Sequence, residues 1–364
     1  MDYGSIKAAV KNGLDLSEKA QRVGYSLLHL LNHEFTSSPN LSLERRVWAY
    51  RHGFVSSSVP SYGLDEMNQH EYLSQWEERL ARQINGETAL IYENKLLFYY
   101  VLWPLFSDVL PELYGYLHEG NYLDIPFSSS SYDHLLDCVD REGKLVIKPI
   151  SGFFGNDVHV LERKDGTYYI DGTSDRSDQI DRLVRQGDDY IVTEFAEQAD
   201  YAATIYPRTP NSMRIMTMID PDTREPFIGA LSHRFGTAES IPVDDVARGG
   251  LSASIDLDTG QLESAAAVRG DETLERYDVH PETGTPITGV EVPGWDRICT
   301  GILDMADYLA PTTPYTGWDV LVTDENGSFV VLEANSYPDA GIQMHGPLLA
   351  DERNRRFYEH YGVV

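Results

Sequence analysis

Two acidic residues and an amide near the carboxyl end of the sequence have the types and the spacing of a magnesium site. Asp319 lies in the apolar run 318–322, Glu333 lies in the apolar run 330–335, and the turn-forming sequence DENGS separates the two runs. This pattern predicts a β-hairpin in which Glu333 and Asn335, two residues apart, point to the same face. A carboxylate buried without a cationic partner is costly, and Mg2+ held by carboxylate oxygens, an amide oxygen and nucleotide phosphates removes that cost. We therefore predict that these three residues bind Mg2+, with a purely structural polar cluster as the alternative.

Two lysines stand out because the chain has only 7 lysines beside 22 arginines. Lys148 lies near the end of the predicted strand 145–150, and the glycine-bearing turn SGFFGN follows it. A lysine charge and the backbone N–H groups of a glycine loop can together hold a polyphosphate. Lys95, directly ahead of the longest apolar run, 96–106, is the second candidate. The alternatives are an exposed lysine before a hairpin for Lys148 and a solvated lysine at the start of a helix for Lys95.

Two arginines lie inside predicted apolar strands, Arg214 in SMRIMT and Arg234 in SHRFG. An arginine inside a strand must find an anion on the face to which it points. Its planar guanidinium group suits a phosphate or a carboxylate. A structural salt bridge is the alternative for both residues.

The predicted strand 190–195 ends among acidic residues, Glu194 and Glu197. The backbone of such a strand end could pair with an adenine edge, and a carboxylate could hold the ribose hydroxyls. Ordinary surface acids are the alternative in so acidic a chain.

These candidates must be positioned by a mixed fold. Residues 15–85 are predicted to be mainly helical, because apolar residues recur at three- and four-residue steps between 16 and 31. Further helices are expected at 45–54 and 65–84, and the Ser/Pro-rich stretches 36–40 and 56–61 separate them. The predicted strands are 145–150, 158–162, 168–171, 190–195, 213–219, 227–235, 251–257, 318–323 and 329–334. With helices at 178–186, 304–309 and 348–361, this pattern indicates an α+β fold.

The composition limits the function classes. The chain has 364 residues with 29 Lys+Arg against 58 Asp+Glu, and its formal net charge is -29. That charge argues against binding to nucleic acid or to an anionic membrane, because the phosphate field would repel it. The acidic residues are spread along the chain without an acidic tail. Such a coat is typical of a protein kept soluble in concentrated salt, so we expect a salt-loving host, with an ordinary acidic enzyme as the alternative.

Cysteine usage and hydropathy favour a soluble, cytoplasmic protein. Cys138 and Cys299 have no spacing motif, so one disulfide is possible but a cysteine-based zinc site is not. The apolar run 96–106 has 11 residues and contains Pro104. A membrane span needs about 20 residues, so we expect this run to be a buried element. No signal peptide is expected in residues 1–14.

The order of the candidates along the chain resembles that of the ATP-grasp superfamily. That order is Lys95, Lys148 with its glycine loop, the acidic strand end, Arg214, Asp319 and Glu333-x-Asn335. More closely, the chain is similar to the sugar-transfer-associated ATP-grasp family. The stretches that carry this similarity are NSMRIMT (211–217), HRFG with RGGLSASIDLDTG (within 233–260), HPETG (280–284) and GWDVLVTDENGSFVVLEANSYPDAGIQMHGP (317–347). The similarity covers about residues 90–364.

Two stretches of the sequence depart from the family's pattern. The segment VDDVARGG has Asp244 and Asp245 before the paired glycines, where families of this kind often have Asn. Ser212 follows Asn211, where Thr is expected. These departures leave the expected nucleotide site intact and put the substrate specificity in doubt.

The resemblance implies a glutathione-synthetase-like fold in which two α+β lobes close on ATP. It divides the chain into an N-terminal helical region (1–89), a linking segment that carries Lys95 (90–140), a small lobe with a glycine lid loop (141–198) and a large lobe with the metal site (199–364).

The resemblance also implies roles for single residues. The expected ATP contacts are Lys95, Lys148, Ser151, Gly152, Phe153, Phe154, Gly155, Glu194, Phe195, Ala196 and Glu197, with Asp200 as the alternative ribose ligand. One or two Mg2+ ions, for which Mn2+ could substitute, are expected at Asp319, Glu333 and Asn335. Arg214 and Arg234 are the expected catalytic residues. The expected substrate contacts are Asp245, Gly249, Gly250, His280 and His345, although both histidines could be ordinary loop residues.

The implied activity is that of an ATP-dependent ligase that joins a carboxylate to an amine through an acyl phosphate. The family name suggests small-molecule or glycan-precursor substrates and a role near surface-polysaccharide synthesis. Two alternatives are a kinase on the same scaffold and a non-catalytic nucleotide-binding module.

Overall fold

The computed structural model describes residues 40–125, 134–151, 157–174, 178–186, 189–268, 270, 272–338 and 340–364. Contacts between residues divide the chain into two compact units. Unit 1 comprises the described residues of Met1–Gln83, Val268–Glu275 and Gly346–Val364, and unit 2 comprises those of Ile84–Ala267 and Arg276–His345. The apolar pattern between residues 16 and 31 lies outside the described residues, and so do the expected loop residues Gly152, Phe153, Phe154 and Gly155.

Unit 1 is helical. Its helices are α2 (Leu43–Arg51), α3 (Ser58–Tyr62), η1 (Gln69–Glu71), α4 (Gln75–Ala81), η6 (Leu348–Ala350) and α11 (Glu352–His360). Ser42 caps α2, and Ser74 and Glu77 form a capping box at α4, so that polar side chains fix where these helices begin. The buried core of α2, α3 and the loops around them consists of Ala49, Phe54, Val59 and Leu64.

Two helices of unit 1 differ from the sequence predictions. Helix α3 lies in the stretch 56–61, which the sequence predicts as a separator. Helix α11 belongs to unit 1, although the sequence places residues 199–364 in one large lobe. In both cases burial of apolar side chains decides the outcome, because Val59 packs in the unit 1 core and Phe357 is fully buried.

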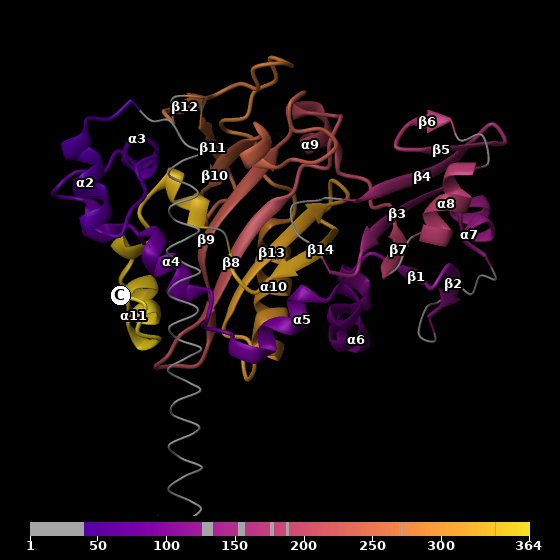
Figure 1. Ribbon diagram of the computed structural model, residues 1–364, viewed down its shortest axis with the longest axis horizontal. Coiled ribbons are helices and arrows are strands. Elements are labelled where there is room, and N and C mark those ends of the chain that lie inside the picture. The colour runs from indigo at the N-terminus through magenta and orange to yellow at the C-terminus, as the bar shows by residue number, and fades with distance from the viewer. Residues whose placement is uncertain are drawn as a thin grey trace, which may run out of the picture. The chain divides into compact units, whose positions relative to one another are not determined.

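The first sheet of unit 2, here called the small sheet, has the strand order β2-β1-β7-β3-β4-β5-β6 (Figure 1). Its strands are β1 (Leu113–His118), β2 (Asn121–Asp124), β3 (Lys144–Pro149), β4 (His159–Lys164), β5 (Thr167–Ile170), β6 (Thr173–Ser174) and β7 (Tyr190–Glu194). Helix α7 (Leu135–Glu142) contacts β3 and β4, and α8 (Asp178–Gln186) contacts β2. Strands β1 and β2 lie in the segment 90–140, which the sequence predicts as a link. This sheet therefore begins before residue 141.

The second sheet, here called the large sheet, has the strand order β12-β11-β10-β9-β8-β13-β14. It belongs to unit 2 except for Val268 at the end of β11 and Leu274 and Glu275 of β12, which belong to unit 1. Its strands are β8 (Met213–Ile219), β9 (Pro226–Phe235), β10 (Leu251–Ile255), β11 (Leu262–Val268), β12 (Leu274–Tyr277), β13 (Tyr315–Val322) and β14 (Phe329–Asn335). Neighbouring strands from β11 to β14 pair antiparallel. The five predicted strands of this region are present, and β11 and β12 are additional.

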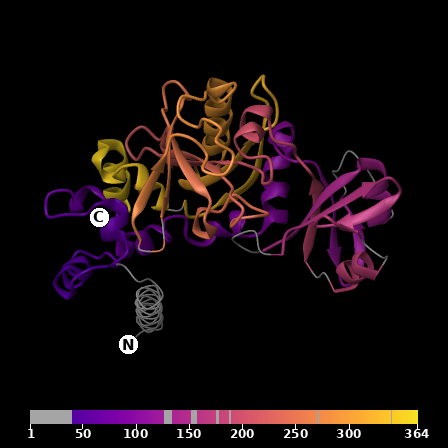
Figure 2. The same cartoon turned by 90° about the horizontal axis from the view of Figure 1, so that it is seen from above.

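The two faces of the large sheet differ in polarity. Directly opposite residues of paired strands point to the same side of a sheet. The pairs Asp319–Glu333, Asp319–Arg214 and Arg214–Ser232 therefore share one side, here called the polar face. Helix α10 (Trp295–Leu309) contacts β8 and β9 (Figure 2). Residues of α10 and of the opposite, apolar face of the sheet form one buried cluster. The helix contributes Ile298, Ile302 and Met305, and the sheet contributes Met213, Ile215, Trp318 and Val320.

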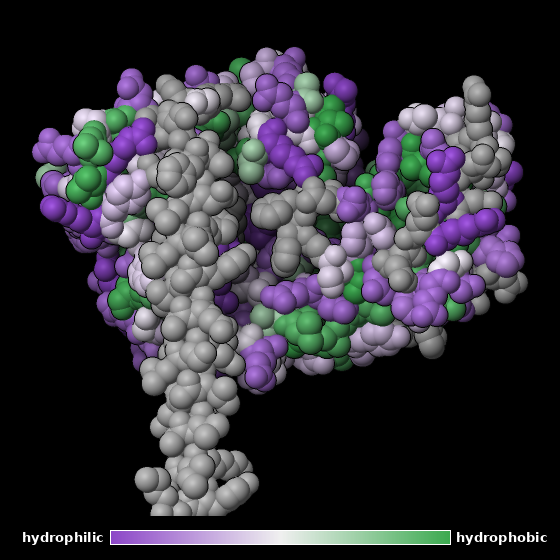
Figure 3. Space-filling model, viewed as in Figure 1, coloured by the Kyte–Doolittle hydropathy of each residue, from purple (hydrophilic) through white to green (hydrophobic). Residues whose placement is uncertain are grey.

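Further helices of unit 2 precede its strands or connect them. These are η2 (Gly86–Ala89), α5 (Leu90–Glu93), α6 (Lys95–Phe106), η3 (Ser107–Val109), α9 (Asp200–Ile205), η4 (Val246–Arg248) and η5 (Ala340–His345). The apolar run 96–106 forms α6, but only one side of it is buried. Leu105 of α6 is 61% exposed and Leu90 of α5 is 56% exposed. Figure 3 shows the apolar surface over these two helices.

The described residues bear on two predictions, the possible disulfide and the absence of a membrane span. Cys138 and Cys299 are both free, so the possible disulfide is not formed. A helix long and apolar enough to cross a bilayer does not occur among the described residues.

Candidate active site

The β13–β14 hairpin brings together the three predicted metal ligands. Asp319 lies directly opposite Glu333, and Gly317 lies directly opposite Asn335. Asn335 Nδ2 lies 3.5 Å from Asp319 Oδ2. The two carboxylates and the amide therefore meet on the polar face, as the spacing predicts.

Two arginines neutralise Asp319. Arg214 Nε and Arg234 Nη2 each lie 2.9 Å from Asp319 Oδ1. Arg214 lies directly opposite Asp319 in the β8–β13 pairing, and Arg234 reaches it from β9. The premise that Asp319 is buried without a cationic partner is therefore wrong, and both arginines form the salt bridge that was the alternative. No local pattern reveals this contact, because 85 residues separate Arg234 from Asp319.

Ser212 and Asp244, two of the three residues that depart from the family pattern, form a network around Arg234. Arg234 Nη2 donates to Ser212 Oγ at 2.6 Å. Asp244 Oδ2 accepts from the Ser212 N–H and hydroxyl, each at 2.7 Å, and lies 3.7 Å from Arg234 Nε. Burial by itself lowers the pKa of Arg234, but Asp244, Asp319 and Glu333 outweigh it and raise that pKa. Arg234 therefore stays charged and is held between two carboxylates.

Lys148 is buried, so the alternative of an exposed lysine does not hold. Its Nζ donates to the carbonyl of Leu332 at 3.0 Å. The β13–β14 register shifts after Asp319, so Leu332 is an extra residue in β14. Such a β-bulge interrupts the ladder and leaves a backbone group for another partner. Burial, and then the charge of Lys95, lower the pKa of Lys148 to about 8.

Lys95 opens α6 and also reaches the acidic pair. Asn94 caps the helix by accepting from the Leu97 N–H at 2.8 Å. The backbone N–H of Lys95 donates to the Ile150 carbonyl at 2.8 Å, and its Nζ lies 3.5 Å from Glu333 Oε2. The side chain is 11% exposed, so Lys95 is not a solvated lysine at a helix start.

Cations outnumber carboxylates in this cluster. Its members are Lys95, Lys148, Arg214 and Arg234 against Asp244, Asp319 and Glu333. Burial raises the pKa of Asp319 to about 6, and the two arginines oppose that rise. Burial also disfavours charged Glu333, but the two lysines and Arg214 outweigh it and lower its pKa. The site therefore has the charge to attract an anion and keeps an acidic pair at its centre.

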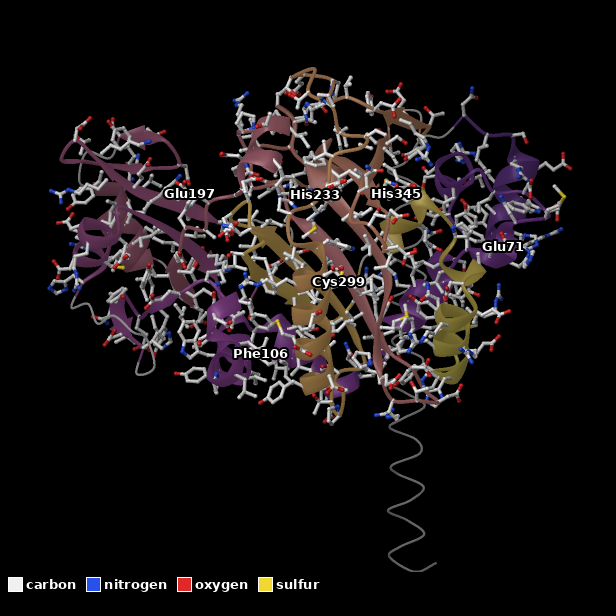
Figure 4. The ribbon with its side chains drawn as sticks, turned by 180° about the vertical axis from the view of Figure 1, so that it is seen from behind. Glu71, Phe106, Glu197, His233, Cys299 and His345 are labelled. Carbon is white, nitrogen blue, oxygen red and sulfur yellow. The ribbon has the colours of Figure 1, made fainter. Side chains whose placement is uncertain are left out.

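The expected adenine hinge is partly occupied by contacts within the small sheet. Strand β7 ends at Glu194, whose N–H donates to the Glu112 carbonyl at 2.8 Å. Glu194 Oε2 accepts from the Glu112 N–H at 3.1 Å. Lys144 Nζ lies 3.4 Å from the centre of the Phe195 ring. Glu197 is exposed on the segment between β7 and α9 (Figure 4), and Ala196 and Glu197 stay predictions. Ser151 is exposed, and Asp200 begins α9.

In the loop before β10, local contacts explain the residue types at Asp245, Gly249 and Gly250. Asp245 accepts from the Ala247 N–H at 2.9 Å, which caps η4. Gly249 has a φ of +95°, which glycine adopts without strain. A Cβ on Gly250 would lie 2.8 Å from the Asp245 carbonyl oxygen. None of these contacts involves the acidic pair, so a substrate role for the three residues stays a prediction.

The two expected substrate histidines differ in their surroundings. His280 is fully buried, with Nε2 2.8 Å from the Gly236 carbonyl and Nδ1 3.3 Å from the Glu282 N–H. Both of its nitrogens are thus used by the backbone, which favours the structural alternative. His345 Nε2 lies 2.8 Å from Ser252 Oγ. Among the described residues, His345 Nδ1 is buried and has no hydrogen-bond partner.

Asn85 is a residue that the sequence analysis does not single out. Its Nδ2 donates to the Tyr315 carbonyl at 2.6 Å and to the Ser336 carbonyl at 2.9 Å, and its Oδ1 accepts from the Tyr315 N–H at 3.2 Å. It thereby holds the start of β13 and the segment that follows Asn335. Asn85 lies in a polar stretch without a periodic pattern, so only the tertiary contacts reveal this role.

Comparison with known proteins gives one family match. The family described as sugar-transfer associated ATP-grasp matches residues 75–355. No match was found among curated proteins.

Several solved structures show a distant likeness. An ADP complex of N5-carboxyaminoimidazole ribonucleotide synthetase is 10% identical, with a TM-score of 0.37 over 68% of this chain and 45% of that chain. The synthetase of the same name from Thermotoga maritima is 10% identical, with a TM-score of 0.35 over 72% and 50%. D-alanyl-alanine synthetase A from Vibrio cholerae is 12% identical, with a TM-score of 0.39 over 76% and 62%. The chain spans about half the length of the first two proteins, and these likenesses carry no argument about its chemistry.

The family match settles the fold assignment. Residues 75–355 make up well over half of the 364 residues. They contain the hairpin, both lysines and both arginines of the cluster. The similarity noted in the sequence is thus confirmed, as is the α+β ATP-grasp fold. The chain belongs to the sugar-transfer associated ATP-grasp family.

Proposed function

We propose that the protein is an ATP-dependent ligase that joins a carboxylate to an amine through an acyl phosphate. One observation carries the proposal: Lys95, Lys148 and Arg214, from three different elements, converge on the acidic pair Asp319 and Glu333. A cluster with surplus positive charge around two carboxylates suits a polyphosphate that carries a divalent cation. Membership in the ATP-grasp family supports the same assignment.

The acidic pair fits a magnesium ion shared with a polyphosphate. Both guanidinium groups approach Asp319 through Oδ1, which leaves Oδ2 on the side of Asn335. Glu333 lies directly opposite Asp319, and its negative charge helps to raise the pKa of Asp319, a cost that a bound cation would remove. Across the described ranges no group of three or more His, Cys, Asp or Glu could hold a metal. Mg2+ takes few protein carboxylates and completes its shell with phosphates and water, so two carboxylates and an amide are enough protein ligands.

The chain's own side chains would divide the work between binding and charge stabilisation. Asp319, Glu333 and Asn335 would hold the ion, which when bound supplies a Lewis acid for the phosphate oxygens. Lys148 would exchange the Leu332 carbonyl for a phosphate oxygen, and Lys95 would bind beside it. Arg214 would stabilise the charge that grows on the transferred group.

The reaction needs no protein nucleophile. A substrate carboxylate oxygen attacks the γ-phosphorus of ATP, the bond to the ADP oxygen breaks, and an acyl phosphate forms. An amine nitrogen then attacks the acyl carbon, and phosphate leaves with the electron pair of the broken C–O bond. Positioning and electrostatics supply the rate acceleration in such transfers. The family's description supports a glycan or surface-polysaccharide precursor as one of the substrates.

The test is a screen for ADP release with carboxylates crossed against amines, in ATP, Mg2+ and molar KCl. The high salt follows from the evenly spread net charge of -29. We expect free phosphate only when both co-substrates are present. Phosphate that stays on a single acceptor would instead identify a kinase and would contradict the proposal.

A matched pair of variants tests the metal site. Glu333→Gln removes one expected ligand and should abolish Mg2+-dependent turnover. Glu225→Gln changes an exposed glutamate in the turn before β9 of the same sheet and should leave turnover unchanged. Equal turnover of the two variants would remove Glu333 from the metal site.

A further inference from the structure

The polar face continues beyond Arg234 onto β10. Ser252 lies directly opposite Arg234 in the β9–β10 pairing, so both side chains point to the same face. His345, the last residue of η5, places Nε2 2.8 Å from Ser252 Oγ. The Ser252–His345 pair is therefore adjacent to the arginine that contacts Asp319, on the side of the cluster away from β14.

His345 differs from His233 of the large sheet in the state of one ring nitrogen. Within the part of the chain that the structure describes, His345 Nδ1 is buried and has no hydrogen-bond partner. His233 lies on the apolar face of β9, with Nε2 2.8 Å from Tyr201 Oη and Nδ1 3.1 Å from the Arg234 carbonyl (Figure 4). A buried polar atom without a partner is rare in a native protein and calls for a specific explanation. A substrate that supplies the missing partner explains the nitrogen of His345.

The surroundings of His345 keep its ring neutral. Burial, and then the positive charge of Arg276, lower its pKa to about 4. Arg276 of β12 lies close to this part of the chain, since its Nη2 donates to the Met344 carbonyl at 3.3 Å. Arg234 of β9 lies directly opposite Ser252, the partner of His345 Nε2, on the polar face. At neutral pH one ring nitrogen of His345 therefore carries a lone pair.

We propose that His345 is the general base of the amide-forming step and that Ser252 positions its ring. The inference rests on the proposed ligase function. The proton of the neutral ring lies on Nε2, which donates to Ser252 Oγ, and Nδ1 faces the incoming amine with its lone pair.

The proton balance of this step is complete. The uncharged amine attacks the acyl carbon, the new C–N bond forms and the C–O bond to phosphate breaks. The nitrogen passes one proton to His345 Nδ1, and the imidazolium passes it to the departing phosphate, which leaves as hydrogen phosphate. A nitrogen that has attacked an acyl group is a much stronger acid than a free ammonium, so a weak base is sufficient. A base positioned in this way contributes about 10²- to 10⁴-fold to the rate.

Hydroxylamine separates this role from the rest of the reaction. It is a weakly basic nucleophile, uncharged at neutral pH, and it traps acyl phosphates as hydroxamates without a catalytic base. The wild type and His345→Gln are incubated with ATP, Mg2+ and a carboxylate panel of D-alanine, L-glutamate, succinate and glucuronate. One set receives hydroxylamine, and the other receives glycine, D-alanine or glucosamine as the amine. Hydroxamate is measured by its ferric complex and amide by mass spectrometry.

We expect His345→Gln to form hydroxamate within about two-fold of the wild type and to lose about 10²-fold or more in amide formation. The glutamine amide can still hydrogen-bond to Ser252, so the fold is preserved. Ser252→Ala should lose amide formation to a smaller extent and keep hydroxamate formation. Loss of both products in equal measure, or retention of both, would overturn the inference.

Two controls keep the outcomes distinct. His233→Gln changes a histidine of the same sheet whose nitrogens both have partners, so it should leave the ratio of amide to hydroxamate unchanged. A wild type that releases ADP with a carboxylate of the panel but forms neither hydroxamate nor amide would refute the ligase function itself, and the inference would fall with it.

Discussion

Replacing Asp319 by Asn should destabilise the large sheet even without any nucleotide. The change keeps the shape of the side chain and removes the charge that two guanidinium groups share at 2.9 Å. The Asp319 side chain is only 6% exposed, so Arg214 and Arg234 would keep buried charges with a weakened partner. Removing one partner of a buried pair costs about 3–5 kcal/mol. Asp244 stays 3.7 Å from Arg234, so we expect the lower end of that range.

Urea and thermal unfolding of the full chain in molar KCl measure this cost. A loss of about 3 kcal/mol corresponds to a fall of roughly 6–12 °C in Tm, at about 2–4 °C per kcal/mol for a domain of this size. Glu333→Gln is the matched comparison, because Glu333 is 34% exposed and has one lysine at 3.5 Å. Its expected cost is about 1 kcal/mol or less.

The two variants also separate structure from metal binding. Glu333→Gln should lose Mg2+-dependent ATP binding in titration calorimetry while the chain stays folded. A cost for Asp319→Asn below about 1 kcal/mol, or equal costs for both variants, would refute the assignment of Asp319 as the residue that holds the arginines.

Three further predictions concern positions around the cluster. Lys148 should titrate near pH 8 in the ligand-free protein, below its value of 10.5 in the unfolded chain. Between pH 8 and 10.5 the unfolded state therefore binds more protons than the folded state, and the free energy of unfolding should rise with pH over this range. NMR of 13C-methylated lysines, with Lys148→Arg to assign the signal, checks this, and a titration near 10.5 would contradict it. Gly317→Ala should cost about 1–3 kcal/mol in urea unfolding, because the new Cβ would lie 2.9 Å from Pro338 Cα. Gly346→Ala is the control, because its Cβ would meet no atom of the described residues within 4 Å, and equal costs for the two variants would count against the packing at Gly317. Asn85→Ala removes hydrogen bonds to three backbone groups and should cost about 1–3 kcal/mol in the same measurement; an unchanged midpoint would show that this amide does not hold the hairpin.

The sequence predicts the hairpin because its signals are local. Two apolar runs, a turn rich in Asp, Asn and Gly, and two carboxylates at fixed offsets all lie within 318–335. Counting from the turn, however, would place Glu333 opposite Trp318, on the apolar face. The register shift after Asp319 corrects this by one residue, and no local signal announces it.

The contacts that depend on distant segments were not predictable in the same way. Arg214 and Arg234 stand out in the sequence, but their common partner follows from the pairing of β8, β9 and β13. Strand β11 has the sequence LESAAAV, which has helical propensity, and its pairing with β10 overrides that preference. Local pattern thus identified most of the chemical groups, and tertiary pairing decided which of them meet.

The extra residue in β14 has a consequence for the length of that strand. In the present sequence the bulge brings Glu333 opposite Asp319. If Leu332 were deleted, the hairpin would continue in one register without a bulge, and the glutamate would still lie opposite Asp319. What a shorter strand would lose is the backbone oxygen that holds Lys148 of the small sheet. A one-residue deletion at this point would leave the two carboxylates opposite each other and remove the carbonyl that accepts the hydrogen bond of Lys148. The length of β14 therefore decides whether this lysine of the small sheet is held beside the acidic residues of the large sheet.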